Sequence, residues 1–263
     1  MKNILVLTDY STCARGAMRY AVEMAATLKG QLIFCHVTAA PTAQDENILR
    51  DYVAAFQQQE APALQLLPHI CIVEAGSPLA LAQSLAQSHH IQLIVMGLSG
   101  SSPMRRQLIG SNSDQMMAQA PAPLLLIPEN ARFVPLHKIG FATDLSEGDL
   151  QPIQEVARLF AAFNPELLLT HISPEASDFH DPRSAAHLFL NRITCNVNYA
   201  KIYYRHITEA DISAGLLWIS EHGRIDIMAM IHRQNRVLPT LLHQSYTQKM
   251  ADLIYLPLLV MPE

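Results

Sequence analysis

The sequence has little of what marks secreted, membrane or nucleic-acid-binding proteins. Only 16% of its 263 residues are charged, the formal net charge is −5, and the longest basic cluster is the pair Arg105–Arg106, so nucleic acid is not an expected partner. The four cysteines form no CxxC pair, which favours reduced, buried thiols. The apolar runs are of strand length, like Leu124–Ile127, whereas a membrane span needs about 20 residues. We therefore expect a cytoplasmic protein with no signal peptide and no membrane partner.

Hydrophobic residues make up 50% of the chain, enough for a substantial core. The first half alternates short apolar runs with segments of helical periodicity, which indicates a parallel, doubly wound α/β sheet. Strands are predicted at residues 3–7, 31–37, 70–74, 92–96 and 124–127, and helices at 11–28, 43–60, 78–88 and from Ser111 onward.

The second half repeats the first. ThrAspTyrSer at 8–11 recurs as ThrAspLeuSer at 143–146, and His36 recurs as His171, both 135 residues later. The end of the unit recurs with an offset of 134 residues. This predicts two domains, 1–130 and 137–263, which pack together because the junction is short. In the second domain we expect strands at 138–142, 166–172, 201–206, 225–230 and 258–261, helices at 147–163, 184–194, 211–222 and 245–252, and a loop at 173–183.

Three of only ten glycines fall between the fourth strand and the next helix, as Gly97, Gly100 and Gly110, and Ser111 follows them. Glycine lets a backbone approach a ligand closely and adopt positive φ. A helix beginning at Ser111 would offer free N–H groups to an anion. In such a sheet the ligand crevice lies beyond the carboxyl ends of the strands, where Asp9 and Val37 also lie.

This Gly-x2-Gly-x9-Gly-Ser spacing resembles the nucleotide motif of ATP-binding universal stress proteins, and the ThrAspTyrSer opening, Gly76 and the LeuLeuIlePro strand are also similar. The resemblance implies two tandem five-stranded domains of the adenine nucleotide alpha hydrolase-like fold. It further implies that ATP, with or without Mg²⁺, is bound by the first domain. Its implied ligand contacts are Thr8, Asp9, Val37, Met96, Gly97, Gly100, Gly110, Ser111, Asn112 and Ser113. Asn112 departs from the small apolar residue that the family often has.

The second copy of the glycine loop has lost its glycines. With the offset of 134 residues, Ile231 replaces Gly97, while Gln234 and Gln244 replace the other two glycines. A β-branched residue cannot give the backbone the freedom of glycine. The second site is therefore expected to be empty or altered, with one nucleotide bound per chain.

Other chemistry is less well supported. Asp9, Ser11 and His36 could form a hydrolytic triad, but Ser11 is placed to cap a helix and no nucleophile elbow surrounds it. Neither a P-loop nor a GxGxxG fingerprint occurs, and the histidines lack metal-ligand spacing. The leading hypothesis is a nucleotide-binding stress-response or regulatory protein with little or no hydrolysis. The alternatives are a weak ATPase or nucleotidyl enzyme, and a scaffold that needs no nucleotide.

The last strand of each domain, Leu124–Ile127 and Leu258–Met261, is strongly apolar. An exposed apolar edge invites pairing, and the resembled family dimerises through this strand. We therefore expect these two strands to face each other as an internal pseudo-dimer. A homodimer is also compatible with the resemblance.

Overall fold

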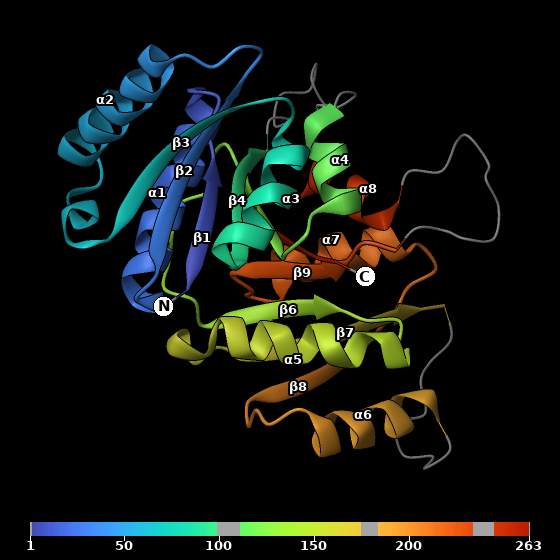
Figure 1. Ribbon diagram of the computed structural model, residues 1–263. Helices are drawn as coiled ribbons and strands as arrows, with labels where there is room; N and C mark the ends of the chain where they lie inside the picture. The colour runs from blue at the N-terminus through green and yellow to red at the C-terminus, as the bar shows by residue number, and fades with distance from the viewer. Residues whose placement is uncertain (1, 99–110, 175–183, 234–244, 263) are drawn as a thin grey trace. The chain divides into compact units, whose positions relative to one another are not determined.

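The computed structural model describes residues 2–98, 111–174, 184–233 and 245–262. The chain divides into two compact units, residues 1–133 and 134–261, which Figure 1 traces from blue to green and from yellow to red. None of the helices in the described ranges has the length and apolar character to cross a membrane.

The first unit contains a five-stranded sheet in the order β3-β2-β1-β4-β5, with all neighbouring strands parallel. Helices α3 and α4 pack together on one face of the sheet, and α1 covers the other (Figure 1). The elements are β1 (Asn3–Leu7), α1 (Thr12–Leu28), β2 (Gln31–Thr38), α2 (Ala43–Gln59), a 3-10 turn (Pro62–Leu66), β3 (His69–Ala75), α3 (Pro78–His89), β4 (Ile91–Leu98), α4 (Ser111–Gln119) and β5 (Leu124–Pro128).

Local sequence accounts for the helix boundaries in this unit. The hydroxyl of Ser11 accepts a hydrogen bond from the N–H of Ala14 and so caps α1, which ends at Lys29 in the left-handed region. Thr42 and Asp45 form a reciprocal capping box at the start of α2. These caps satisfy backbone groups that the first and last helical turns cannot pair internally.

The second unit repeats this architecture in the order β10-β9-β6-β7-β8, again with parallel neighbours. Its elements are β6 (Lys138–Ala142), α5 (Leu150–Leu159), β7 (Glu166–Ser173), α6 (Ala185–Asn196), β8 (Ile202–Thr208), α7 (Ile212–His222), β9 (Ile227–Ile231), α8 (Tyr246–Leu253) and β10 (Leu258–Met261). Most of the loop predicted at 173–183 lies outside the described residues.

The helix predicted at 147–163 is divided into three pieces. A 3-10 turn over Glu147–Asp149 precedes α5, and another over Ala161–Phe163 follows it. The first turn is tight because the N–H of Asp149 bonds to Ser146 O three residues earlier, at 3.2 Å. Its carboxylate turns inward and accepts a hydrogen bond from the hydroxyl of Thr143. The last piece ends at Asn164, which has a φ of 53°.

Strand register shows that the sequence offsets are structural equivalences. Ile4 pairs with Leu32 in the first sheet, and the residues 135 positions later, Ile139 and Leu167, pair in the second. At the other side of each sheet, Gly97 pairs with Ile127 and Ile231 with Met261, at an offset of 134. Ile231 therefore occupies the position of Gly97.

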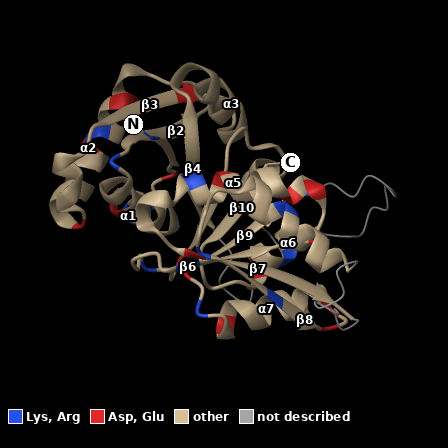
Figure 2. Cartoon of the chain, turned by 90° about the horizontal axis from the view of Figure 1, so that it is seen from below, with Lys and Arg blue, Asp and Glu red and all other residues tan. Residues whose placement is uncertain are grey.

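Figure 2 shows Lys and Arg scattered over both units rather than gathered along one element. One local cluster joins α1 to the end of α2, where Arg15 and Arg19 both pair with Glu60. Although partial burial acts to raise it, these two guanidinium groups lower the pKa of Glu60 below its ordinary value. These ion pairs link the end of α2 to α1.

Candidate functional site

A tight corner follows β1, and its four residues explain the ThrAspTyrSer sequence. The hydroxyl of Thr8 accepts from the N–H of Tyr10 at 3.1 Å, and the carboxylate of Asp9 accepts from the N–H of Ser11 at 3.0 Å. Tyr10 has a φ of 64°, which the corner imposes. Ser11 then caps α1. The corner leaves the Asp9 side chain exposed at the end of the strand.

His36 on β2 is held against this corner. Its Nδ1 lies 2.8 Å from the carbonyl oxygen of Thr8, and because a carbonyl only accepts, Nδ1 of the neutral ring carries the hydrogen. The ring also lies 4.4 Å from that of Tyr10, centroid to centroid. The hydroxyl of Ser11 is used by the helix cap, and no hydrogen bond joins it to His36 among the described residues. The triad hypothesis gains no support from this geometry.

A cavity of about 480 Å³ opens at the carboxyl ends of β1, β2 and β4. This is the point where the sheet order reverses, with β2 and β3 on one side of β1 and β4 and β5 on the other. The predicted site residues among its lining are Thr8, Asp9, Val37, Met96, Gly97, Asn112 and Ser113. Ser111 begins α4, without a description of its side chain, and Gly100 and Gly110 lie outside the described residues.

The cavity also contains residues that the sequence analysis did not place in the site. They are Leu7, Ser11, Ala14, Cys35, His36, Thr38, Ala39, Gly76, Ser77 and Pro78. The signal for the last three was present, because Gly76-Ser77-Pro78 links a strand end to a helix start. Gly76 has a φ of 113° and Ser77 caps α3 through the N–H of Ala80 at 3.2 Å.

Gly97 has a packing role in addition to the one that its spacing suggested. A Cβ on Gly97 would lie 2.7 Å from the carbonyl carbon of Cys13 and 2.9 Å from the nitrogen of Ala14. Its φ is not in the left-handed region. Gly97 therefore lets β4 pass directly against the first turn of α1, and packing alone already demands glycine here.

The electrostatic character of the cavity comes from backbone and hydroxyl groups. Among its described lining residues Asp9 is the one charged side chain, and no Lys or Arg is present. The first turns of α3 and α4 lie at its rim, through Ser77, Pro78, Asn112 and Ser113. Helix N-termini carry partial positive charge and free N–H groups. Burial raises the pKa of the Cys35 thiol well above its ordinary value, so this thiol is not a nucleophile at neutral pH.

The second unit reproduces the backbone N–H bonds of the corner, but the hydroxyl of Ser146 does not cap the helical turn that follows it. The N–H of Leu145 donates to the hydroxyl of Thr143 at 2.9 Å, and the N–H of Ser146 donates to Asp144 at 3.0 Å. Leu145 has a φ of 65°, matching Tyr10, and His171 Nδ1 lies 3.0 Å from Thr143 O. The repeat found in the sequence is therefore also a repeat of these three contacts.

An arginine distinguishes the second corner. Arg233, just after β9, pairs with the carboxylates of Asp144 and Asp149, and its guanidinium donates to the hydroxyl of Ser146 at 2.8 Å. Burial raises the pKa of Asp149 to about 6, although hydrogen bonds from Thr143 and Ser146 act to lower it. The guanidinium of Arg233 beside it favours the ionised carboxylate. The acid equivalent to Asp9 already has a cation within its own domain.

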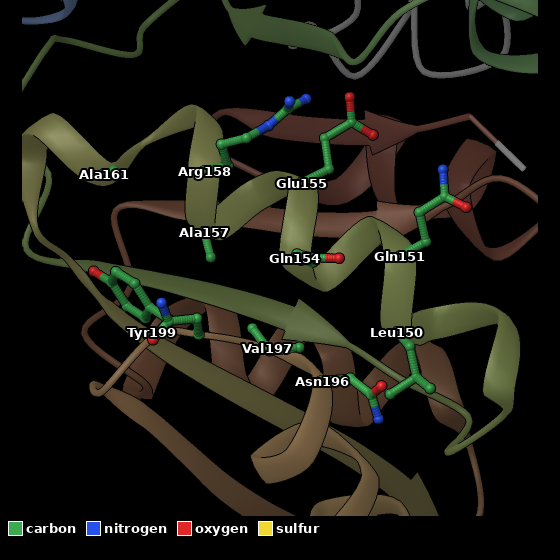
Figure 3. A pocket seen from close by; sticks show the side chains of 11 residues that line it. Leu150, Gln151, Gln154, Glu155, Ala157, Arg158, Ala161, Asn196, Val197 and Tyr199 are labelled. Carbon is green, nitrogen blue, oxygen red and sulfur yellow. The ribbon is translucent and has the colours of Figure 1, made fainter.

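Two further hollows lie in the second unit. One, of about 310 Å³, is at the ends of β6, β7 and β9, beside the first turns of α7 and α8. The other, of about 800 Å³, lies between α5 and the connection that follows α6. In Figure 3, Arg158, Glu155 and Gln151 project from one side of α5 while Val197 and Tyr199 lie on the other. These polar groups do not converge on one point, and within the described residues no cluster of His, Cys, Asp or Glu suits a metal ion.

Known proteins place this architecture in a family. The model of the universal stress protein family matches residues 1–128, whereas no curated protein sequence matches the chain. A universal stress protein from Archaeoglobus fulgidus DSM 4304 is 16% identical over 99% of this chain and 98% of that chain, with a TM-score of 0.71.

Two other solved structures extend the comparison. A putative universal stress protein from Pseudomonas aeruginosa UCBPP-PA14 is 12% identical over 100% of this chain and 93% of that chain, with a TM-score of 0.68. The cytoplasmic domain of a prokaryotic cation chloride cotransporter is 12% identical over 98% and 94%, with a TM-score of 0.58. At these identities the likeness shows the fold alone. The N-terminal domain, residues 1–128, belongs to the universal stress protein family, and the chain carries this α/β fold twice in tandem.

Proposed function

We propose that the N-terminal domain binds an ATP-class nucleotide and that the protein is a nucleotide-dependent regulator in a stress response, with little or no hydrolysis. The observation that carries this proposal is the cavity at the sheet's switch point. Seven of the ten residues predicted from the sequence line it, and they come from three strand ends and the start of α4. In doubly wound sheets this is where nucleotides bind.

The lining suits the separate parts of a nucleotide. The family resemblance assigns Asp9 to the adenosine part, and Asp9 uses Oδ1 for the Ser11 N–H, so the second oxygen can accept from a ribose hydroxyl. The N-terminal turns of α3 and α4 supply N–H groups for phosphates. Because Asp9 is the one carboxylate in the described lining, Mg²⁺ would be held mainly by phosphate oxygens and water.

Slow or absent turnover follows from the state of the nucleophiles. The Ser11 hydroxyl caps a helix and the Cys35 thiol is protonated. His36 donates its Nδ1–H to Thr8 O and keeps Nε2 as an acceptor, but no hydrogen bond joins it to either of these nucleophiles among the described residues. Hydrolysis needs a base that activates water or a side chain. No such pair is formed among the described lining residues.

The repeated corner offers a matched pair of variants for testing. In Asp9→Asn and Asp144→Asn the amide oxygen can still accept from the following serine N–H, so both corners can form. We expect Asp9→Asn to weaken ATP binding about 10- to 100-fold, because the variant loses a charge-assisted hydrogen bond to the nucleotide. Asp144→Asn should leave ATP affinity unchanged. Calorimetric titration of the full chain with ATP, with and without Mg²⁺, measures both.

The alternatives give different results in the same experiment. Absence of heat with ATP in the wild-type chain would support the scaffold hypothesis instead. Equal weakening by the two variants would locate the effect outside the proposed site. Phosphate release well above the buffer rate, lost in Asp9→Asn, would favour a weak ATPase.

We also infer that the two domains pair through Leu124–Ile127 and Leu258–Met261. Within its own unit each segment forms an edge strand, β5 or β10. Both are apolar throughout, and natural proteins rarely leave such an edge exposed.

Amide hydrogen exchange tests this pairing without mutation. Outward-facing N–H groups of β5 and β10 should exchange slowly and independently of protein concentration, whereas those of the outer edges β3 and β8 should exchange fast. Rapid exchange in β5 and β10 would refute pairing. Protection that rises with concentration would indicate a homodimer instead.

A further inference from the structure

The cavity in the second unit has the position of the nucleotide cavity but a different lining. Counterpart positions follow from the strand registers and the sequence offsets of 134 and 135 residues, and those of Pro78 and Ile212 from the first residues of α3 and α7. Larger apolar or aromatic side chains replace smaller or polar ones: Ile231 for Gly97, Ile172 for Val37, Ile212 for Pro78 and Tyr246 for Asn112. These four changes reduce the room for phosphates and make this part of the lining more apolar than its counterpart in the first unit.

The charges at this cavity are already paired with one another. Arg233 contacts both Asp144 and Asp149, and Thr143 donates to Asp149. An incoming phosphate would compete with two carboxylates for the guanidinium, and an incoming cation would compete with the guanidinium for the carboxylates. Separating such an ion pair is costly where one partner is buried. The cavity therefore disfavours charged ligands of either sign.

One hydrogen-bonding group in the lining remains unsatisfied. Thr170 on β7 is 2% exposed, and its Oγ1 has no hydrogen-bond partner among the described residues. Thr170 lies two residues before Ile172 on the same strand, so both side chains project from the same face. Both line the cavity, and Ile172 faces α7 at Gly215. A buried hydroxyl without a partner is unfavourable, and a ligand group in the cavity would satisfy it.

We propose that this cavity binds a small uncharged molecule with an apolar body and one hydroxyl or carbonyl group, which hydrogen-bonds to Thr170 Oγ1. The apolar body lies against Ile172, Ile212 and Leu216, which line the cavity together with Ile231. Its volume of about 310 Å³ is at the lower end for small-molecule sites. The tandem would thus hold two different ligands, one in each domain.

Phenol and toluene are matched probes, because they differ by a hydroxyl in place of a methyl group. In the full chain with ¹³C-labelled isoleucine methyl groups, millimolar phenol should shift the signals of Ile172, Ile212 and Ile231. ATP should leave these three signals in place, since no isoleucine lines the nucleotide cavity among its described residues. This readout does not depend on whether the first domain binds nucleotide.

The variant Thr170→Val keeps the side-chain shape and removes the unsatisfied hydroxyl. We expect the affinity ratio of phenol to toluene to fall about three- to tenfold in this variant, the value of one neutral hydrogen bond. Unchanged isoleucine signals with phenol in the wild-type chain would overturn the proposal. So would an affinity ratio that is the same in wild type and Thr170→Val, because Thr170 would then not contact the ligand.

Discussion

Replacing Gly97 by alanine separates the structural need for this glycine from its part in ligand binding. The added Cβ would lie 2.7 Å from the Cys13 carbonyl carbon, 2.8 Å from the Cys13 sulfur and 2.9 Å from the Ala14 nitrogen. Two of these three atoms belong to the backbone of α1, which cannot rotate away. The first turn of α1 must shift, and overpacking of this kind costs about 1–3 kcal/mol. We expect Gly97→Ala to lower the free energy of unfolding by that amount in the absence of any nucleotide.

Urea denaturation followed by circular dichroism measures the loss, and hydrogen exchange locates it. Faster exchange should appear in β4 and the start of α1. Trp218, the chain's single tryptophan, lies on α7 of the other unit, so its fluorescence reports whether the second unit is affected.

Gly148→Ala is the matched control, because the nearest atom to its added Cβ is the Ser146 hydroxyl at 3.6 Å, an ordinary contact. It should change stability little. An unfolding free energy of Gly97→Ala that equals the wild-type value would refute the packing argument. Gly97 would then be required only for the ligand.

Three further outcomes follow from the structure. In Gly76→Ala the added Cβ would have no atom within 4 Å, but residue 76 has a φ of 113°. Backbone strain should therefore lower the free energy of unfolding by about 1–3 kcal/mol in a thermal or urea melt. An unchanged stability would mean that the loop relaxes. The pKa of Glu60 is lowered in the folded state from its ordinary value of 4.5. Its carboxylate therefore stabilises the fold above pH 4.5, and this contribution is lost as the pH falls through the lowered pKa. Glu60→Gln should therefore be less stable than wild type by under about 1 kcal/mol at neutral pH, with the difference vanishing in acid; a difference that persists there would contradict the ion pair. Calorimetry should give one ATP per chain, and two equivalent sites would contradict the altered second corner.

Most of the fold could be predicted from hydrophobic periodicity and from the residues that begin and end helices and strands. The predicted strands at 3–7, 138–142 and 258–261 match the observed ones to the residue, because buried parallel strands are short, continuous apolar runs bounded by polar residues. The prediction of one continuous helix at 147–163 was wrong. The apolar residues of this segment have helical spacing, but Asp149 bonds to the distant Arg233, and this contact decides the local geometry. A contact between residues so far apart in the chain cannot be recognised from the local sequence.

The candidate site was predictable where it depends on strand ends and not where it depends on packing. Asp9 and Val37 could be placed because parallel strands end at one edge. The reason for Gly97 could not be found, since it depends on how closely α1 passes, a distance that no sequence spacing encodes. Arg233 was also missed, because its partners lie 84 and 89 residues earlier in the chain. The unsatisfied hydroxyl of Thr170 likewise exists only once its neighbours are in place.

The corner built from Thr, Asp and Ser has a consequence for interpreting duplicated proteins. Its two backbone N–H bonds and its left-handed third residue recur in both halves, although among the described residues an arginine pairs with the aspartate of the second half alone. After a duplication, such a corner is retained because the chain must turn there, whether or not the domain still binds a ligand. Counting its occurrences in a genome would count folded domains rather than occupied sites, and the number of ligands must be inferred from the residues around it.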